Sequence, residues 1–354
     1  MVTISLCMIV KNEEAVLARC LDSAKECVDE IIIADTGSTD KTKEIARKYT
    51  DRIYDFEWVN DFSAARNFAF SKAAMDYQMW LDADDELDKA AQAGIIQLKQ
   101  SMSPAVDMVT MKYNTHFDAG GNPILTSTRE RLVKREKNYR WIDPVHECIP
   151  MAGNILHSDI AIHHRKVSAG NPTRNIDIYS ALESSGKPLT PRQMYYFARE
   201  LKDHGHWAKS AYYFNKFLNS GMGWHEDNIA ACLGLSNCYT QLKDEHKILP
   251  VLLKSFEYDI PRADICTELG YYYKNMRNFQ QAFKWFDLAA KLGRPDSFGF
   301  IRQDYYGYIP NIECCVCLCE MGDFQKASIY NERAAQFKLT PAIEINRKFL
   351  AAKL

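Results

Sequence analysis

The residues with the clearest chemical potential form an acidic run, Asp82-Ala-Asp84-Asp85-Glu86, directly after the apolar segment 77–81. Four acids so close together repel one another strongly in a dry site, and a divalent cation relieves that repulsion. Carboxylate oxygens are hard ligands, which favours Mg²⁺ or Mn²⁺. The same composition is also typical of a solvated helix N-terminus, where the helix dipole favours acids. The run alone therefore leaves metal binding and helix capping open.

A second acid, Asp35, follows another apolar segment and precedes a Gly-Ser-Thr turn. A carboxylate at such a strand end can accept the imide N–H of uracil, and the glycine lets a nucleotide pass close to the backbone. The chain has no Gly-x-Gly-x-x-Gly sequence and no Walker lysine loop. Without these motifs, a dinucleotide-binding or P-loop fold has no support from the sequence.

The elements that must position these acids alternate between β-rich runs and amphipathic stretches. Strands are predicted at residues 4–10, 30–34, 52–56 and 77–81, and helices at 15–27, 39–49 and 63–74. This alternation predicts a parallel, doubly wound α/β sheet, whose ligands bind at the carboxyl ends of the strands. Hairpin strands follow at 109–117 and 123–134 around a Gly/Asn turn at 118–122, and a strand at 159–164 closes this half.

From about residue 175 the pattern is entirely helical. The second helix of each predicted pair opens on an aromatic or equivalent residue, with a small or apolar one three later: Trp207 and Ser210, His246 and Leu249, Phe279 and Ala282, Phe324 and Ala327. The spacing scatters around the tetratricopeptide period of about 34 residues. Stacked pairs create an extended concave face, which suits peptides. We expect the tyrosine-rich clusters at 195–197, 212–214 and 271–273 to serve mainly in helix packing.

Composition narrows the class of protein. The chain has 354 residues, 47% of them hydrophobic, which predicts two globular domains. A net charge of −2 without a dense Lys/Arg run argues against nucleic acid as a partner. No charge-free apolar stretch reaches the roughly 18 residues that span a bilayer, and we interpret the apolar N-terminus as a strand, not a signal peptide.

The eleven cysteines, without a secretory segment, favour a reducing cytoplasm over a disulfide framework. Four of them are clustered, at Cys314, Cys315, Cys317 and Cys319. On a helix these side chains point in several directions, and no second Cys/His pair follows at zinc-finger spacing. We therefore expect them to be small packing residues.

Four ordered motifs, at residues 5–14, 34–42, 62–67 and 80–85, resemble family 2 glycosyltransferases with the GT-A fold. Later segments, at 129–135, 141–147 and 164–166, together with the helical repeats, resemble the subgroup that fuses such a domain to tetratricopeptide-like helices. That subgroup includes SunS-like peptide S-glycosyltransferases. The resemblance implies a GT-A catalytic domain at residues 1–170 and a helical-repeat domain at 171–354. The second domain would bind the acceptor or form a homodimer.

The resemblance also assigns roles on the donor side. Asp35 would contact uracil, and Glu13, with Val10 and Lys11 in the same loop, would line the nucleoside. Arg66 would reach toward the donor sugar or phosphate. Asp82 and Asp84 would form the Asp-x-Asp pair, with Asp84 the direct ligand of Mg²⁺ or Mn²⁺. A histidine would complete the metal shell; strand parity with Ile160 and Ile162 favours His164, and His163 remains open.

On the acceptor side, the resemblance places the catalytic base at Glu147, with His146 close by. Asp143 and His146 are the next candidates for the base. The implied reaction is inverting hexosyl transfer from a UDP-sugar to a Cys, Ser or Thr side chain of a peptide or protein. Two alternatives remain: transfer to a carbohydrate or cell-envelope precursor, and a repeat scaffold whose sugar-nucleotide domain is inactive.

Overall fold

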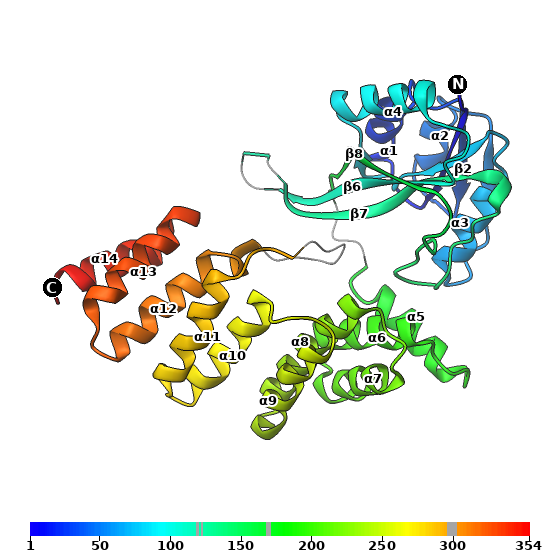
Figure 1. Ribbon diagram of the computed structural model, residues 1–354. Coiled ribbons are helices and arrows are strands. Elements are labelled where there is room, and N and C mark those ends of the chain that lie inside the picture. The colour runs from blue at the N-terminus through cyan, green and yellow to red at the C-terminus, as the bar shows by residue number, and fades with distance from the viewer. Residues whose placement is uncertain (118–119, 122, 168–170, 296–302) are drawn as a thin grey trace. The chain divides into compact units, whose positions relative to one another are not determined.

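A computed structural model describes residues 1–117, 120–121, 123–167, 171–295 and 303–354 (Figure 1). The chain forms two compact units, Met1–Lys187 and Pro188–Leu354, here called the N-terminal and C-terminal units. The N-terminal unit is α/β and the C-terminal unit is helical. Helix α5 (Arg174–Ser184) belongs to the N-terminal unit, although the sequence places it after the predicted domain boundary at residue 170.

One eight-stranded sheet organises the N-terminal unit, in the order β3-β2-β1-β4-β7-β6-β8-β5. Its first four strands are parallel: β1 (Ile4–Val10), β2 (Glu30–Asp35), β3 (Ile53–Asp55) and β4 (Tyr77–Trp80). The next strand, β7 (Pro123–Lys134), runs antiparallel to β4. The sheet is therefore mixed, and the predicted parallel winding describes its first half.

The second half of the sheet is built from the predicted hairpin, β6 (Met108–Phe117) with β7, and from β8 (Ile155–His164). The hairpin turn lies partly outside the described residues, at 118, 119 and 122. The short edge strand β5 (Asp85–Glu86) pairs with β8. Sequence reasoning missed β5, because two acids have low strand propensity and only the pairing with β8 makes them a strand.

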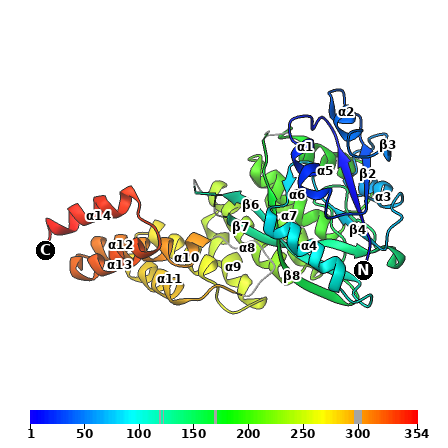
Figure 2. The same cartoon turned by 90° about the horizontal axis from the view of Figure 1, so that it is seen from above.

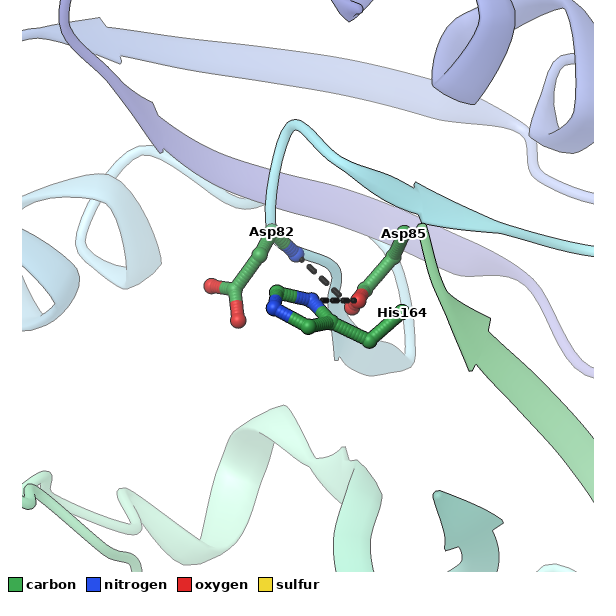
Figure 3. A group of neighbouring side chains, drawn as sticks. All are labelled: Asp82, Asp85 and His164. Atoms are coloured by element: carbon green, nitrogen blue, oxygen red, sulfur yellow. Dashed lines mark hydrogen bonds and ion pairs between the residues drawn. The ribbon is translucent and has the colours of Figure 1, made fainter. Parts of the chain in front are cut away.

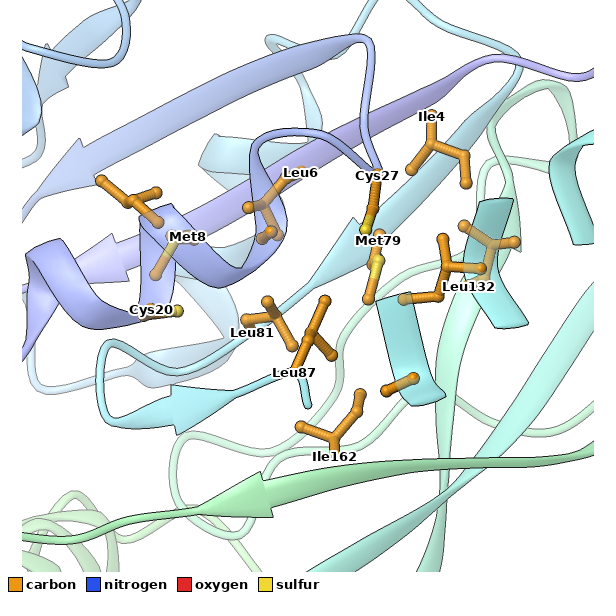
Figure 4. Close-up of a cluster of buried hydrophobic side chains, with 14 of the residues drawn as sticks. Ile4, Leu6, Met8, Cys20, Cys27, Met79, Leu81, Leu87, Leu132 and Ile162 are labelled. Atoms are coloured by element: carbon orange, nitrogen blue, oxygen red, sulfur yellow. The ribbon is translucent and has the colours of Figure 1, made fainter. Parts of the chain in front are cut away.

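Both faces of the sheet are covered by helices, and this explains why every residue of β1 except the partly buried Ile9 is buried. Ile4, Leu6 and Met8 point to one face, where they pack with Cys20 of α1 (Leu17–Ala24) and with α4 (Lys89–Ser101) (Figure 4). Cys7 points to the other face, toward the cluster around Trp80. On this face lies α3 (Phe62–Phe70), whose N-terminus is capped by a bond from the Ala64 N–H to the Asp61 carboxylate. The remaining short helix, α2 (Thr42–Ala46), follows β2.

Consecutive helices of the C-terminal unit lie side by side in pairs (Figures 1 and 2). They are α6 (Pro191–Asp203), α7 (Trp207–Ser220), α8 (His225–Gln241), α9 (Glu245–Lys254), α10 (Ala263–Asn275), α11 (Phe279–Lys291), α12 (Tyr308–Glu320), α13 (Phe324–Phe337) and α14 (Pro341–Ala351). The expected second helices are α7, α9, α11 and α13. Three begin at the predicted residue, and α9 begins one residue before it. The small residues Ser210, Ala282 and Ala327 are fully buried, which lets paired helices approach closely.

The cysteine cluster lies on α12 and serves packing. Cys314 and Cys317 pack with Phe286 in one cluster, whereas Cys315 belongs to another. Burial raises the pKa of the Cys317 thiol to about 12, so it stays protonated at neutral pH. Within the described part of the chain, no helix has both the length and the apolar composition needed to cross a membrane.

Candidate active site

The parallel strands end at one edge of the sheet, and this brings distant residues together. Val10 at the end of β1 lies opposite Asp35 at the end of β2. On the other side of β1, Cys7 pairs with Trp80, so the chain leaves β4 toward Asp82 at the same edge. The predicted nucleotide and metal residues are therefore neighbours, as expected for the carboxyl ends of parallel strands.

Asp35 is buried, with one carboxylate oxygen engaged and one free. Its Oδ1 accepts the backbone N–H groups of Gly37 and Ser38, at 3.0 and 2.9 Å. Gly37 has a φ of +99°, a conformation that side-chain-bearing residues rarely adopt. Oδ2 is buried and has no hydrogen-bond partner among the described residues. A buried acceptor without a donor is costly, so this oxygen is suited to a ligand N–H.

The loop after β1 is locked to the loop after β2. The Glu13 N–H donates to Thr42 Oγ1 at 2.7 Å, and the Glu14 N–H donates to an Asp40 carboxylate oxygen at 3.1 Å. Lys41 N–H returns a bond to Glu14 Oε2 at 3.0 Å. The Val10 side chain is buried in the core, so only its backbone can face a ligand. Lys11 is exposed.

Acids and a histidine converge next to these loops. Ligand atoms of Asp82, Asp85 and His164 all lie within 4.8 Å of one another (Figure 3). The pairing of β5 with β8 causes this, because it sets Asp85 opposite His164. Asp84 also takes part, since its Oδ1 lies 3.2 Å from His164 Nδ1. Carboxylate oxygens with one imidazole form a donor set that fits Mn²⁺ or Mg²⁺.

Asp85 has a structural role that sequence reasoning missed. Its carboxylate is fully buried and accepts the Asp82 N–H, Arg131 NH1 and the Tyr113 hydroxyl, each at 3.0 Å. The bond to Asp82 shapes the turn that presents the acidic run. Its position in the run was the available signal, but the partners Arg131 and Tyr113 come from β7 and β6.

The two adjacent histidines point to different partners, as alternation along a strand requires. His164 faces the acidic cluster, and its Nδ1 also lies 2.9 Å from the Tyr113 hydroxyl. His163 Nε2 instead lies 3.1 Å from the carboxylate of Asp88, which caps α4. The structure thus groups His164, and not His163, with Asp82 and Asp85.

The electrostatics of this edge favour a cation. Burial and the charges of Asp84 and Asp82 raise the pKa of Glu13 to about 7. Although burial opposes a charged ring, hydrogen bonds to Asp84 and Asp85 raise the pKa of His164 to about 10. Nearby carboxylates contribute to both pKa shifts, and in Glu13 burial is the larger cause. A bound divalent cation would relieve the repulsion between these carboxylates.

Arg66 joins the acidic cluster to the candidate base. Its NH2 donates to Asp82 Oδ1 at 2.7 Å, and its Nε donates to Glu147 Oε1 at 2.8 Å. The guanidinium packs against the rings of Trp80 and Trp141, 4.8 Å from each centroid. Although burial opposes ionisation, the pKa of Asp82 is held at about 2 by Arg66 and Arg131. Arg66 NH1 is buried without a partner among the described residues, which leaves one donor for a ligand.

Glu147 and His146 lie in a loop, residues 141–148, that follows the main sheet hairpin. The Glu147 side chain is 14% exposed, and Arg66 engages one oxygen of its carboxylate. His146 is a neighbour of Tyr179 from α5, with ring centroids 6.5 Å apart. The loop therefore presents a carboxylate with one oxygen held and one oxygen available to a proton.

Comparison with known proteins matches the sequence of the N-terminal unit to one family. Residues 5–158 match the family described as Glycosyl transferase family 2. A TPR repeat-containing protein of Synechococcus elongatus is 37% identical over 149 residues, 42% of this chain and 36% of that protein. The chain thus spans about a third of the length of that relative.

Two further relatives carry glycosyltransferase names. SPbeta prophage-derived glycosyltransferase SunS of Bacillus subtilis is 25% identical, over 82% of this chain and 68% of its own length. Lipopolysaccharide core biosynthesis glycosyltransferase LpsC of Rhizobium meliloti is 26% identical, over 58% of this chain and 82% of its own. Among solved structures, glucosyl-3-phosphoglycerate synthase of Mycobacterium tuberculosis with Mn²⁺ and UDP aligns at a TM-score of 0.37 and 16% identity, covering 53% of this chain and 82% of that one.

Proposed function

We propose that this chain is an inverting glycosyltransferase that transfers a sugar from a UDP-sugar to a peptide or protein side chain. Residues 5–158 match the family 2 glycosyltransferase model, and helical repeats follow them, which supports the proposal. The domain match and the mixed sheet agree with the expected GT-A fold. The observation that carries the proposal is the pair of hydrogen bonds made by Arg66. One goes to Asp82 in the candidate metal site, and the other goes to the candidate base, Glu147.

The donor nucleotide would bind along the ends of β1 and β2. The free, buried Oδ2 of Asp35 would accept the uracil imide N–H. The locked loop that contains Lys11 and Glu13 would line the nucleoside, with the backbone of Val10 contributing at the strand end. The free NH1 donor of Arg66 supports a contact with the donor sugar or phosphate.

Asp82, Asp84 and His164 would hold the divalent cation, with the buried Asp85 orienting the group. Asp84 is our choice of direct ligand, because its carboxylate is less committed than that of Asp85. When bound, Mg²⁺ or Mn²⁺ would neutralise negative charge on the diphosphate leaving group.

Glu147 would act as the general base. Arg66 fixes one of its oxygens, and the other would take the proton from the acceptor as the acceptor atom bonds to the anomeric carbon. The bond from that carbon to the diphosphate oxygen breaks in the same displacement, and UDP leaves. No covalent enzyme intermediate is needed. His146 lies next to Glu147 in the loop, and Asp143 and His146 are the alternative bases.

The acceptor is proposed to be a Cys, Ser or Thr side chain of a peptide. Two observations support this choice: the alignment with SunS over 82% of this chain, and paired helices of the kind that form extended binding faces. The similarity to LpsC keeps a carbohydrate or cell-envelope precursor as the second candidate. The acids at Asp35, Asp82, Asp84 and Glu147 argue against an inactive scaffold.

Titration calorimetry with UDP tests the donor and metal assignments together. We expect UDP to bind in Mn²⁺ or Mg²⁺ and to bind at least about tenfold more weakly in EDTA, because the diphosphate would otherwise face Asp82 and Asp84 without a cation. Asp84→Ala should behave in Mn²⁺ as the wild type does in EDTA.

The matched control is Asp51→Ala, an exposed acid outside the site. It should leave UDP binding and its metal dependence unchanged. Equal UDP affinity with and without EDTA in the wild type would contradict the metal assignment, and no UDP binding in either condition would contradict the donor assignment.

A further inference from the structure

The loop at 141–148 has a backbone that needs outside support. Asp143 and His146 have φ values of +70° and +55°, a region that residues with side chains rarely occupy. Such conformations persist where surrounding contacts fix them, and they cluster at functional sites. His146 immediately precedes the candidate base Glu147, so the direction of its backbone sets where the Glu147 carboxylate points.

Most of the supporting contacts come from the matched domain itself. The Asn67 side chain bonds both the N–H and the carbonyl of Trp141, at 3.0 and 2.9 Å. The Phe62 N–H donates to the Pro144 carbonyl at 2.9 Å, and Arg129 NH2 donates to the Glu147 carbonyl at 3.3 Å. Helix α3 and strand β7 therefore hold both ends of the loop.

The Val145 carbonyl, which lies between these anchors, is held by a residue outside the matched segment. The hydroxyl of Tyr179 in α5 donates to the Val145 carbonyl at 3.2 Å. The Tyr179 side chain is fully buried, and its ring lies beside His146 at an interplanar angle of 20°. Tyr179 lies beyond residues 5–158, the segment that matches the family. A second residue of α5 also faces the domain, since the Arg174 guanidinium lies 4.5 Å from the Phe62 ring centroid.

We propose that α5 belongs to the catalytic apparatus and that Tyr179 is a positioning residue for Glu147. The Val145 carbonyl and the His146 N–H share one peptide plane, so the Tyr179 bond fixes the rotation that gives His146 its positive φ. That rotation aims Glu147 at Arg66. This inference rests on the proposed function, because it concerns how the proposed base is held.

Loss of the Tyr179 hydroxyl should therefore lower the rate of transfer without weakening donor binding. Tyr179 bonds the Val145 carbonyl and lies beside His146, whereas the proposed donor side lies at the ends of β1, β2 and β4. Without its hydroxyl, the Val145 carbonyl is left buried and unpaired, and the loop can rotate. A displacement of about 1 Å in a catalytic group can lower a rate about 10²-fold. Because Tyr179 is one of several anchors of the loop, removal of its hydroxyl should lower the rate by less than about 10²-fold.

The test compares full-length wild type with Tyr179→Phe, which keeps the ring and removes the hydroxyl. The probe is UDP-glucose in Mn²⁺, with UDP release as the readout. We expect kcat to fall about tenfold, while the Kd for UDP stays within about twofold. Tyr195→Phe is the matched control, since Tyr195 is also buried but lies in α6 of the C-terminal unit. It should leave kcat unchanged.

A double-mutant cycle separates positioning from general stabilisation. Glu147→Gln alone should keep UDP binding and lower kcat about 10²-fold. If Tyr179 acts through Glu147, adding Tyr179→Phe to Glu147→Gln should cost no more than about twofold. A full further tenfold loss in the double variant would overturn the proposal, because it would show that the two residues act independently.

A second readout needs no substrate. Amide hydrogen exchange across residues 141–148 should be faster in Tyr179→Phe than in wild type and unchanged in Tyr195→Phe. Unchanged exchange with unchanged kcat would refute the role of Tyr179. That result is distinct from failure of the proposed function, which would show as absent UDP binding in the wild type.

Discussion

At the scale of single residues, the active-site edge is defined by carboxylates that differ in their partners. Asp85 is fully buried and accepts three hydrogen bonds, and Asp82 is bound by Arg66. The pKa of Glu13 is raised by burial and by the charges of neighbouring acids. Acids of one chemical class thus include a buried anchor, an ion-pair partner of Arg66 and a group with a raised pKa. Partners, more than identity, separate these roles.

The raised pKa of Glu13 predicts that the affinity for Mn²⁺ depends on pH. Its pKa of about 7 means that it largely holds a proton at pH 6 and is largely ionised at pH 8. A cation beside Asp84 and Asp82 favours the ionised form, so cation binding should release this proton. The affinity for Mn²⁺ should therefore rise between pH 6 and pH 8, and Glu13 should contribute about five- to tenfold of that rise.

Calorimetry with Mn²⁺ at the two pH values measures this contribution as the difference between wild type and Glu13→Gln. The His164 proton affects both proteins alike, so it cancels in the comparison. Glu44→Gln, an exposed acid on α2, is the control and should match wild type. The same pH dependence in Glu13→Gln as in wild type would exclude Glu13 as the group that titrates.

At the scale of elements, small residues decide how closely the paired helices approach. Gly270 of α10 faces the fully buried ring of Phe286 in α11, and an added Cβ would lie 2.5 Å from Phe286 Cε1. Gly234 of α8 meets Phe214 of α7 in a similar way, at 2.6 Å from Cζ. The glycines make room for aromatic rings, and the rings fill the space between helices.

Gly270→Ala should therefore destabilise the C-terminal unit. The methyl group overlaps a ring that packing holds in place, at a cost of about 1–3 kcal/mol, while the gain in helix propensity returns about 1 kcal/mol at most. Thermal unfolding of the full chain should show the lower midpoint. Gly293→Ala, with open space around the new Cβ, should not lower it, and equal midpoints in the two variants would contradict this account of the packing.

At the scale of the whole molecule, we propose that the two units divide the task, with donor chemistry in the N-terminal unit and acceptor binding in the C-terminal unit. The carboxylates and histidine of the proposed site all lie in the N-terminal unit, which ends at Lys187 and includes α5. The C-terminal unit supplies helical surface, which supports a role in acceptor binding. A small sugar acceptor would need only a pocket beside the donor, whereas a peptide benefits from an extended face.

Removing the C-terminal unit tests this division. Residues 1–187 should bind UDP in Mn²⁺ within about threefold of the full chain and transfer sugar to a cysteine-containing peptide about 10²-fold more slowly. Transfer to a simple sugar should fall much less. Circular dichroism verifies that the shorter chain is folded. Undiminished peptide transfer would assign the repeats to stability or dimerisation and favour the carbohydrate acceptor.

Sequence alone determined the local features. The bounds predicted from the sequence for β1 and β7 match the structure to the residue. Sequence patterns can predict them because the burial of a strand depends on the strand's own side chains. The sequence also predicted that Asp35 and Asp82 follow strands, and the parallel arrangement then placed both at one edge. Strand parity favoured His164 over His163, and the structure groups His164 with the acids.

Only the tertiary structure decided which side chains meet. The Asp85–Arg131 pair joins residues 46 positions apart, the Arg66–Glu147 bond spans 81 positions, and the Tyr179–Val145 bond spans 34. Periodicity reports on neighbours within one helix or strand and carries no information about such pairs. The placement of α5 in the N-terminal unit has the same cause: its apolar spacing predicts a helix, but only the buried contacts of Tyr179 show which unit the helix joins.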